Sequence, residues 1–239
     1  MHCTGVRITA GMVSVFREPH LRLGVVASDV MEHFYRAMRT PQHPMLSDLI
    51  TSGGNSYADL KLTIRTFQGG GNIDITPGAL LVDIRDVNQA TAYSRIAKEH
   101  FQLCEEVTQV ALKGVEIVER FMRASLWLAC DGGRPAMEAF LAEKGNAALK
   151  LDKPPYNDLR KDFTLQFSGL DATKATKLTL AMQPSAAGGD LFVQFEYTQY
   201  GKPVVVKSPT EQFEEAETEL MALMLHVGLE LQRDNAGKP

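Results

Sequence analysis

The sequence predicts an α+β fold that consists of two similar halves. Three observations support this prediction: segments in which apolar and polar residues alternate, two long amphipathic helices, and the same order of elements in each half. Each predicted unit runs strand, helix, three-strand antiparallel meander and long helix. The first unit occupies residues 1–114 and the second occupies residues 115–239. At 239 residues and 44% hydrophobic composition, the chain is large enough for the two units to share one core.

In the first half, the alternation of apolar with polar residues is strictest from Ala58 to Arg65, which indicates a strand with one buried and one wet face. Asp29 and Glu32 have the spacing of a capping box at the start of the shorter helix. Gly114 is suited to end the long helix, because glycine adopts the left-handed conformation that is common after a helix. The expected strands are 6–16, 21–26, 58–65, 73–75 and 80–84, and the expected helices are 29–40, 43–52 and 88–113.

The second half repeats this order. Ser208, Pro209 and Glu211 are typical of a helix start, with a capping residue, a proline in the first turn and a glutamate at the third position. The pattern Met-Glu-x-Phe at residues 137–140 matches the same pattern at residues 31–34. The expected strands are 115–118, 124–130, 163–167, 178–182 and 191–197, the expected helices are 135–144 and 209–233, and a disordered tail is expected at 234–239.

A sheet of this size with one wet face is marginal alone, so the two units are expected to join sheets or helix layers around one pseudo-twofold core. We expect curved antiparallel sheets that are covered on one face by the long helices. The element order resembles the helix-grip and TATA-binding-protein-like classes, in which a curved sheet wraps a long helix. This resemblance covers the whole chain but rests on no specific motif. Duplicated ferredoxin-like units are the alternative, and they would need a further strand after each long helix.

Composition narrows the class of function. The chain holds 25 Lys and Arg against 29 Asp and Glu, for a formal net charge of −4. A protein that coats nucleic acid is usually strongly basic, so no nucleic-acid partner is expected. Three cysteines are too few, and odd in number, for a disulfide framework, which favours a reducing, cytoplasmic location. No apolar run has the length of a signal peptide core or a membrane span, so no membrane partner is expected.

The sequence holds no motif that assigns a catalytic residue, a cofactor or a metal. Residues 69–71 are three glycines, but a strand pattern follows them, which indicates a hairpin turn rather than a phosphate-binding loop. The six histidines lack the spacing of zinc ligands, and no Gly-x-Ser-x-Gly nucleophile motif occurs. Cys104 and Cys130 are interpreted as inert. An enzyme that uses two carboxylates, with Asp83 and Glu196 as a pseudo-symmetric acid pair, is the least favoured alternative.

We therefore predict a non-catalytic intracellular binding protein: a protein-interaction adaptor, an inhibitor or an assembly subunit, with a protein partner or self-association. Two surfaces are candidates. The start of the last helix is an acidic dock for a basic partner, and the wet sheet face carries charges of both signs. The first comprises Glu211, Glu214, Glu215, Glu217 and Glu219, and the second includes Lys61, Arg65, Asp83, Arg85 and Glu196.

A small-molecule-binding protein is the alternative. Its pocket would lie between the curved sheet and a long helix, where aromatic side chains of the second half gather. Phe163, Phe167, Phe195, Tyr197 and Met224 are the expected lining.

Overall fold

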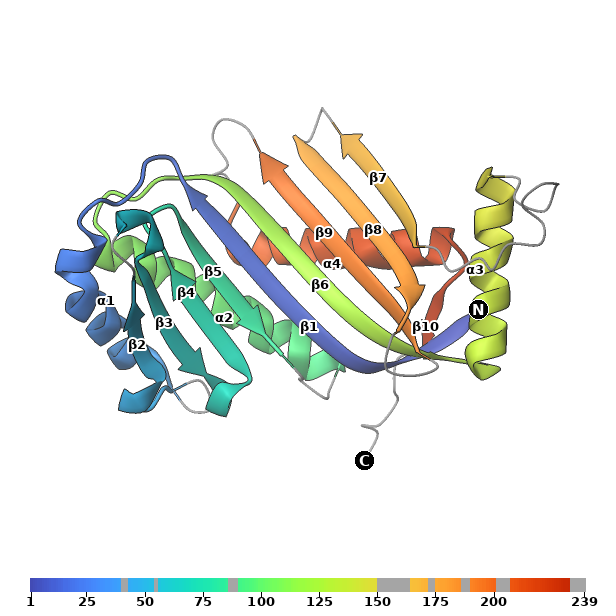
Figure 1. Cartoon of the computed structure of the whole chain (residues 1–239), viewed down its shortest axis with the longest axis horizontal. Coiled ribbons are helices and arrows are strands. Elements are labelled where there is room, and N and C mark those ends of the chain that lie inside the picture. The colour runs from blue at the N-terminus through green and yellow to red at the C-terminus, as the bar shows by residue number, and fades with distance from the viewer. Residues whose placement is uncertain are drawn as a thin grey trace.

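The chain folds around one curved, mainly antiparallel sheet with helices packed against it, which confirms the α+β class (Figure 1). The computed structural model describes residues 1–39, 43–53, 56–85, 90–149, 164–171, 175–185, 190–200 and 207–232. Within them the sheet has ten strands in the order β2-β3-β4-β5-β1-β6-β9-β8-β7, and β10 pairs with β1. The expected tail at 234–239 lies outside the described residues.

The helices and strands occur in nearly the same order in each half of the chain. The strands are β1 (His2–Phe16), β2 (Leu49–Ser52), β3 (Lys61–Thr66), β4 (Gly71–Ile75), β5 (Ala79–Ile84), β6 (Ile117–Cys130), β7 (Leu165–Asp171), β8 (Thr176–Pro184), β9 (Leu191–Tyr200) and β10 (Glu230–Gln232). The α-helices are α1 (Leu23–Ala37), α2 (Ala90–Ala111), α3 (Gly133–Leu149) and α4 (Pro209–His226).

The two longest strands, β1 and β6, lie side by side and antiparallel at the centre of the sheet (Figure 1). Each is followed by a helix, a meander and a long helix, so the strands of each half extend outward from this central pair. The first half adds β2 to its meander, and the second half adds β10 after its long helix. The result is one continuous sheet in place of separate ones, and the duplication itself stays a prediction.

Two predicted elements of the first half are wrong. Residues 21–26 do not form a strand, because they lead into α1, whose buried residues Leu23, Val30 and Phe34 follow a helical spacing. Asp29 is therefore inside the helix and does not cap it. Residues 43–52 are not a helix either, since they contain only a short 3-10 turn before β2.

The second half differs from prediction in two places. The expected strands 115–118 and 124–130 are one strand, β6, which runs without interruption through two arginines. The last helix ends at His226 and not near residue 233, because Gly228 takes a positive φ of 90° and turns the chain into β10. A strand thus follows each long helix, whereas the sequence predicts a disordered tail after the second.

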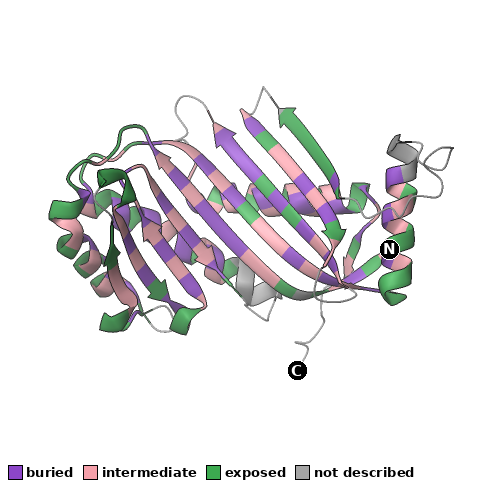
Figure 2. Ribbon diagram, in the orientation of Figure 1, coloured by how far each residue is buried: buried purple, intermediate pink, exposed green. Residues whose placement is uncertain are grey.

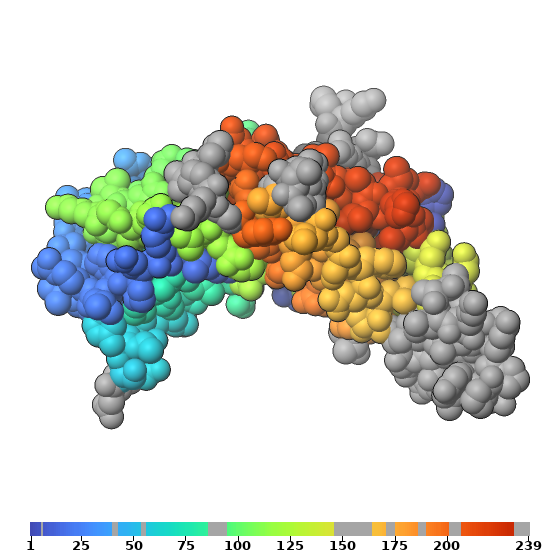
Figure 3. Space-filling model, turned by 90° about the horizontal axis from the view of Figure 1, so that it is seen from above, coloured from blue at the N-terminus to red at the C-terminus, as the bar shows by residue number. Residues whose placement is uncertain are grey.

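Helices cover one face of the sheet. Alternate side chains of each strand point toward them, which produces the succession of buried and partly exposed positions along the strands in Figure 2. Seen from above, α2 (green) and α4 (red) gather on one side of the molecule and the teal and orange strands on the other (Figure 3). α2 and α4 also contact each other, so the long helices of the two halves pack together.

A buried ion pair lies where the two halves meet. Arg120 of β6 donates to both carboxylate oxygens of Glu105 on α2, at 3.0 and 2.5 Å, and both side chains are more than nine-tenths buried. Ser14 of β1 donates to the same carboxylate at 2.9 Å. The remaining guanidinium nitrogen donates to Gln212 of α4 and to the carbonyl oxygen of Lys207, both at 3.0 Å. This network joins β1, α2, β6 and α4.

Replacing the arginine should expose how much the fold depends on this network. Arg120→Met leaves Glu105 buried without its cation, so the free energy of unfolding should fall by about 3–5 kcal/mol. Urea unfolding followed by circular dichroism measures this loss. The double variant Glu105→Leu with Arg120→Met should recover most of it, because neither charge is then left unpaired. A single variant as stable as the wild type would show that the network contributes little.

His100 is a buried, uncharged histidine in α2. Its side chain is fully inaccessible, and its ring packs edge-on against Phe67 with centroids 4.9 Å apart. Burial lowers the pKa of His100 to about 4. The unfolded chain therefore binds this proton more tightly than the folded chain does, and stability is lost as pH falls below about 6.5 toward 4.

This histidine predicts a defined acid sensitivity. Between pH 7 and pH 5 the wild type should lose about 2 kcal/mol of unfolding free energy that a His100→Leu variant does not lose. Urea midpoints of both proteins at the two pH values measure the difference. Equal pH dependence in the two proteins would contradict the assignment.

Candidate binding surface

The face of the sheet opposite the helices is open. In Figure 1 this face points toward the viewer, and no helix of the described residues crosses its centre. Along each strand, every second residue points away from the helices and onto this face. The antiparallel registers align these side chains into rows that run across the strands. We call this surface the open face.

The central row of the open face is polar. Asp83 of β5, Gly11 of β1, Arg123 of β6 and Glu196 of β9 are register partners in that order. Asp83 and Arg123 form a two-pronged ion pair, at 2.8 and 3.1 Å, across the glycine. A Cβ atom at Gly11 would lie 2.5 Å from the Asp83 carboxylate and 2.6 Å from the Arg123 Nε. The bare glycine therefore makes room for this pair.

A shallow hollow of about 230 Å³ lies beside this row. Thr9, Ser125 and Gln194 supply neutral hydrogen-bonding groups from three adjacent strands, and Arg85 lies at its edge with Asp83 and Arg123. These side chains offer both donors and acceptors. The hollow thus presents a polar centre on the middle strands of the sheet.

Apolar side chains flank the polar centre on two sides. On one side, Leu81, Val13 and Phe121 are successive register partners on β5, β1 and β6. On the other side, the rings of Trp127 and Phe192 lie with centroids 4.8 Å apart on β6 and β9. All five are partly exposed.

Arg7 of β1 adds a cation to the aromatic side. Its guanidinium carbon lies 4.8 Å from the centroid of the Trp127 ring, within cation–π range. The contact therefore favours one orientation of the partly exposed ring.

The structure places the predicted sheet-face charges on this same open face. Lys61 contacts Asp74 at 3.3 Å, and Arg65 follows on the same side of β3. Arg85 and Asp83 lie together at the hollow. The predicted acid pair is not brought together, because β1 and β6 separate Asp83 from Glu196 by three strand spacings, about 14 Å.

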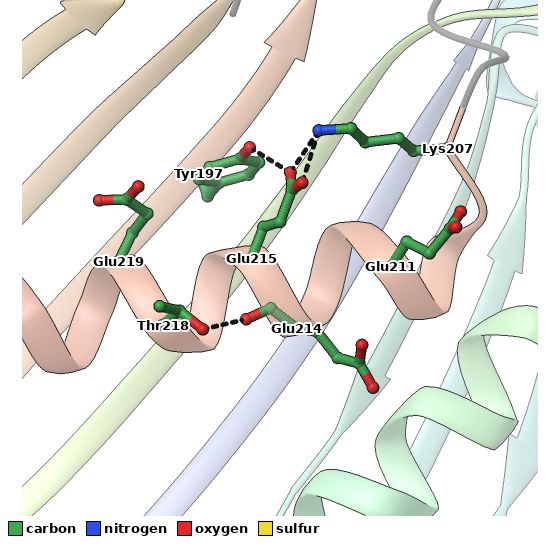
Figure 4. Close-up of a pocket in the computed structure, with 7 residues that line it drawn as sticks. All are labelled: Tyr197, Lys207, Glu211, Glu214, Glu215, Thr218 and Glu219. Carbon is green, nitrogen blue, oxygen red and sulfur yellow. Dashed lines mark hydrogen bonds and ion pairs between the residues drawn. The ribbon is translucent and has the colours of Figure 1, made fainter.

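The predicted acidic dock lies on α4 and is partly neutralised from within (Figure 4). Glu215 accepts hydrogen bonds from Lys207 at 2.5 and 2.8 Å and from Tyr197 at 2.9 Å. Glu211 completes a capping box with Ser208, and those hydrogen bonds lower the pKa of the Glu211 carboxyl.

Two more acids of this group pair with α2. Lys98 lies 3.1 Å from Glu214 and 3.9 Å from Glu217, so these contacts join the long helices of the two halves. Glu211, Glu214, Glu215 and Glu219 line a hollow of about 540 Å³ with Lys207, Tyr197 and Thr218. The acidic dock stays a prediction, since part of its charge already serves intramolecular contacts.

The residues expected to line a ligand pocket have different environments. Phe195, Tyr197 and Met224 are at most 3% exposed and belong to the core between sheet and helices. Phe167 is 41% exposed, on the outermost strand β7. Phe163 lies outside the described residues. The ligand pocket therefore also stays a prediction.

Several residues of the open face were missed from the sequence. Phe121, Arg123 and Trp127 all lie on β6, and the expected break in that strand removed the first two from any sheet face. The alternation from Phe121 to Ala129 could have revealed them, had the strand been extended through Arg120.

The described residues hold neither a metal-binding cluster nor a membrane-spanning helix. No group of three or more His, Cys, Asp or Glu side chains among them is placed to hold a metal ion. No helix in that part of the chain is long and apolar enough to cross a membrane.

No protein-family model matches the chain, and no curated protein matches it. Among solved structures, the chain aligns with that of a nonspecific heme-binding cyclase, described as catalysing a cycloaddition in neoabyssomicin biosynthesis. The alignment has 10% identity and a TM-score of 0.19, and it covers 99% of this chain and 81% of that chain. A TM-score this low carries no argument about fold or function.

Gly11 allows a direct test of the central row. Gly11→Ala should reduce the free energy of unfolding by about 1–2 kcal/mol, because the new methyl group must displace the Asp83–Arg123 pair. Gly5→Ala is the matched control on the same strand, since its nearest atom would lie 3.6 Å away. Thermal unfolding of both variants measures the difference, and equal stability would contradict a tight approach at Gly11.

Proposed function

We propose that this protein binds another protein through the open face and acts as an adaptor, inhibitor or assembly subunit. One observation carries the proposal: a polar hollow at the centre of the uncovered sheet face has apolar and aromatic clusters on both sides. Protein interfaces are enriched in aromatic residues and arginine, and their strongest contacts cluster near the centre. The open face has this composition at its middle strands.

The aromatic rings of the open face are suited to anchor a partner protein. Trp127 packs on Phe192 and under Arg7, so its orientation is set before any partner arrives. Because the rings are already restrained, binding would order few additional side-chain rotamers. A preformed aromatic patch of this kind favours a folded partner surface over a small ligand in a closed cavity.

The charge of the open face indicates the kind of partner. Among the described side chains this face carries six cations against five anions, although the whole chain has a net charge of −4. The cations are Arg7, Lys61, Arg65, Arg85, Arg123 and Lys177, and the anions are Asp74, Asp83, Glu119, Glu196 and Glu230. A partner with an acidic surface would complement this excess.

The repeated element order supports an inference about origin. Strand, helix, meander and long helix occur in the same sequence in each half, and the two first strands pair at the centre of the sheet. We infer that the two halves arose by duplication of one ancestral unit. A central pair of equivalent strands would place the open face across the pseudo-twofold axis.

Removing the aromatic anchors should weaken binding without unfolding the protein. The double variant Trp127→Ala with Phe192→Ala should bind the partner at least tenfold more weakly, a loss of about 1.4 kcal/mol or more. The partner is first identified by cross-linking the tagged full chain in its own cells. Affinities of the purified proteins are then compared by calorimetry, with circular dichroism to verify the fold.

The matched control removes exposed apolar side chains from the helix side. Val110→Ala with Leu225→Ala truncates two residues that are 61% and 63% exposed on α2 and α4. This control should bind the partner as the wild type does. Loss of binding in the control, with binding retained in the aromatic double variant, would place the interface on the helix side and overturn the proposal.

A further inference from the structure

Two cysteines from different halves of the chain face each other across the central strand pair. Cys3 of β1 and Cys130 of β6 are register partners, and their sulfur atoms lie 3.2 Å apart. Both are free thiols and both are buried, Cys3 at 1% and Cys130 at 9% exposed. They are separated by 127 positions in the sequence.

This arrangement meets the backbone requirement of a disulfide. Residues directly opposite on antiparallel strands have Cα atoms about 4.5–5.5 Å apart, within the range of about 4.4–6.8 Å that disulfides span. Their side chains also lie on the same face of the sheet. Bond formation therefore needs rotation of two side chains and no movement of a strand.

We propose that Cys3 and Cys130 are a redox modification site, at which a reversible disulfide fastens the first strand of one half to the first strand of the other. The oxidant class is a small-molecule disulfide such as oxidised glutathione. This inference is independent of the proposed protein-binding role of the open face.

Cys130 is the attacking thiol in this reaction. It is the more exposed of the two, and it precedes Gly132 and Gly133, which turn the chain at the end of β6. A hydrogen bond from the Cys3 thiol lowers the pKa of Cys130 and raises that of Cys3. A thiolate at Cys130 is thus favoured over one at Cys3.

The exchange has two steps. The Cys130 thiolate attacks one sulfur of oxidised glutathione, which forms a mixed disulfide and releases one glutathione thiolate. That thiolate takes the proton of Cys3, and the Cys3 sulfur then attacks the Cys130 sulfur and releases the second glutathione as a thiolate, which takes up the proton that Cys130 had lost to solvent. Two protein thiols are oxidised to one disulfide, and one glutathione disulfide is reduced to two thiols.

Cys104 supplies an internal control. It lies fully buried on the sheet-facing side of α2, and burial raises its pKa well above that of a free thiol. It should therefore remain reduced while the other two cysteines react.

Thiol counting on the full-length protein tests the proposal. The folded protein is equilibrated with reduced and oxidised glutathione at fixed ratios, quenched in acid, denatured and alkylated. The intact mass should show three alkyl groups before oxidation, and one alkyl group with the loss of two hydrogens after it. Peptide mapping should identify a disulfide-linked peptide that contains Cys3 and Cys130. Dithiothreitol should restore three alkylated cysteines.

Variants and thermal unfolding complete the test. Cys104→Ala should keep the oxidation step, whereas Cys3→Ala should retain a glutathione adduct on Cys130. Oxidation should raise the melting temperature of the wild type by about 5–10 °C, and Cys130→Ala should show no such rise. Three alkylated cysteines at every ratio, a stable glutathione adduct on the wild type, or a bridge to Cys104 would each overturn the proposal.

Discussion

The fold depends on the contact between Arg120 and Glu105. The guanidinium and the carboxylate are both removed from water. Each therefore needs the opposite charge and further hydrogen-bond partners to offset the cost of losing its hydration. Those partners are Ser14, Gln212 and the carbonyl oxygen of Lys207, so the pair fixes the position of two strands and both long helices at once. Alternation alone would keep the same faces buried if a strand slipped by two residues, whereas this network accepts one register. The central strands are thereby aligned, and with them the rows of side chains on the open face.

The position of the helices has a direct effect on the other face. α2 and α4 bury one set of alternate residues, so the second set must either be polar, meet solvent or meet a partner. At the centre it is polar, with Asp83 and Arg123 closing over Gly11. Beside that centre it is aromatic, and the rings of Trp127 and Phe192 remain partly exposed. This exposed aromatic surface supports the proposed binding role of the open face.

Local patterns predicted much of this architecture. Alternation identified β3, β5 and β9, and the capping box at Ser208 placed the start of α4 correctly. The patterns failed where tertiary contacts overrule local ones. Arg120 interrupts an apolar strand and looks like a break, because its partner Glu105 is a helical residue that no local pattern can associate with it. The same error affected the open face, since the predicted break at residues 119–123 also removes Phe121 and Arg123 from the sheet.

The pairing of β10 with β1 has a consequence for how the chain is made. β1 leaves the ribosome before its partners β6 and β10, which lie more than a hundred and more than two hundred residues later. While the second half is being synthesised, the backbone N–H and C=O groups on one edge of β1 have no strand to pair with. Contacts between such distant segments slow folding, and exposed strand edges attract other chains. The protein is thus most vulnerable to aggregation during synthesis, before β6 and β10 have paired with β1.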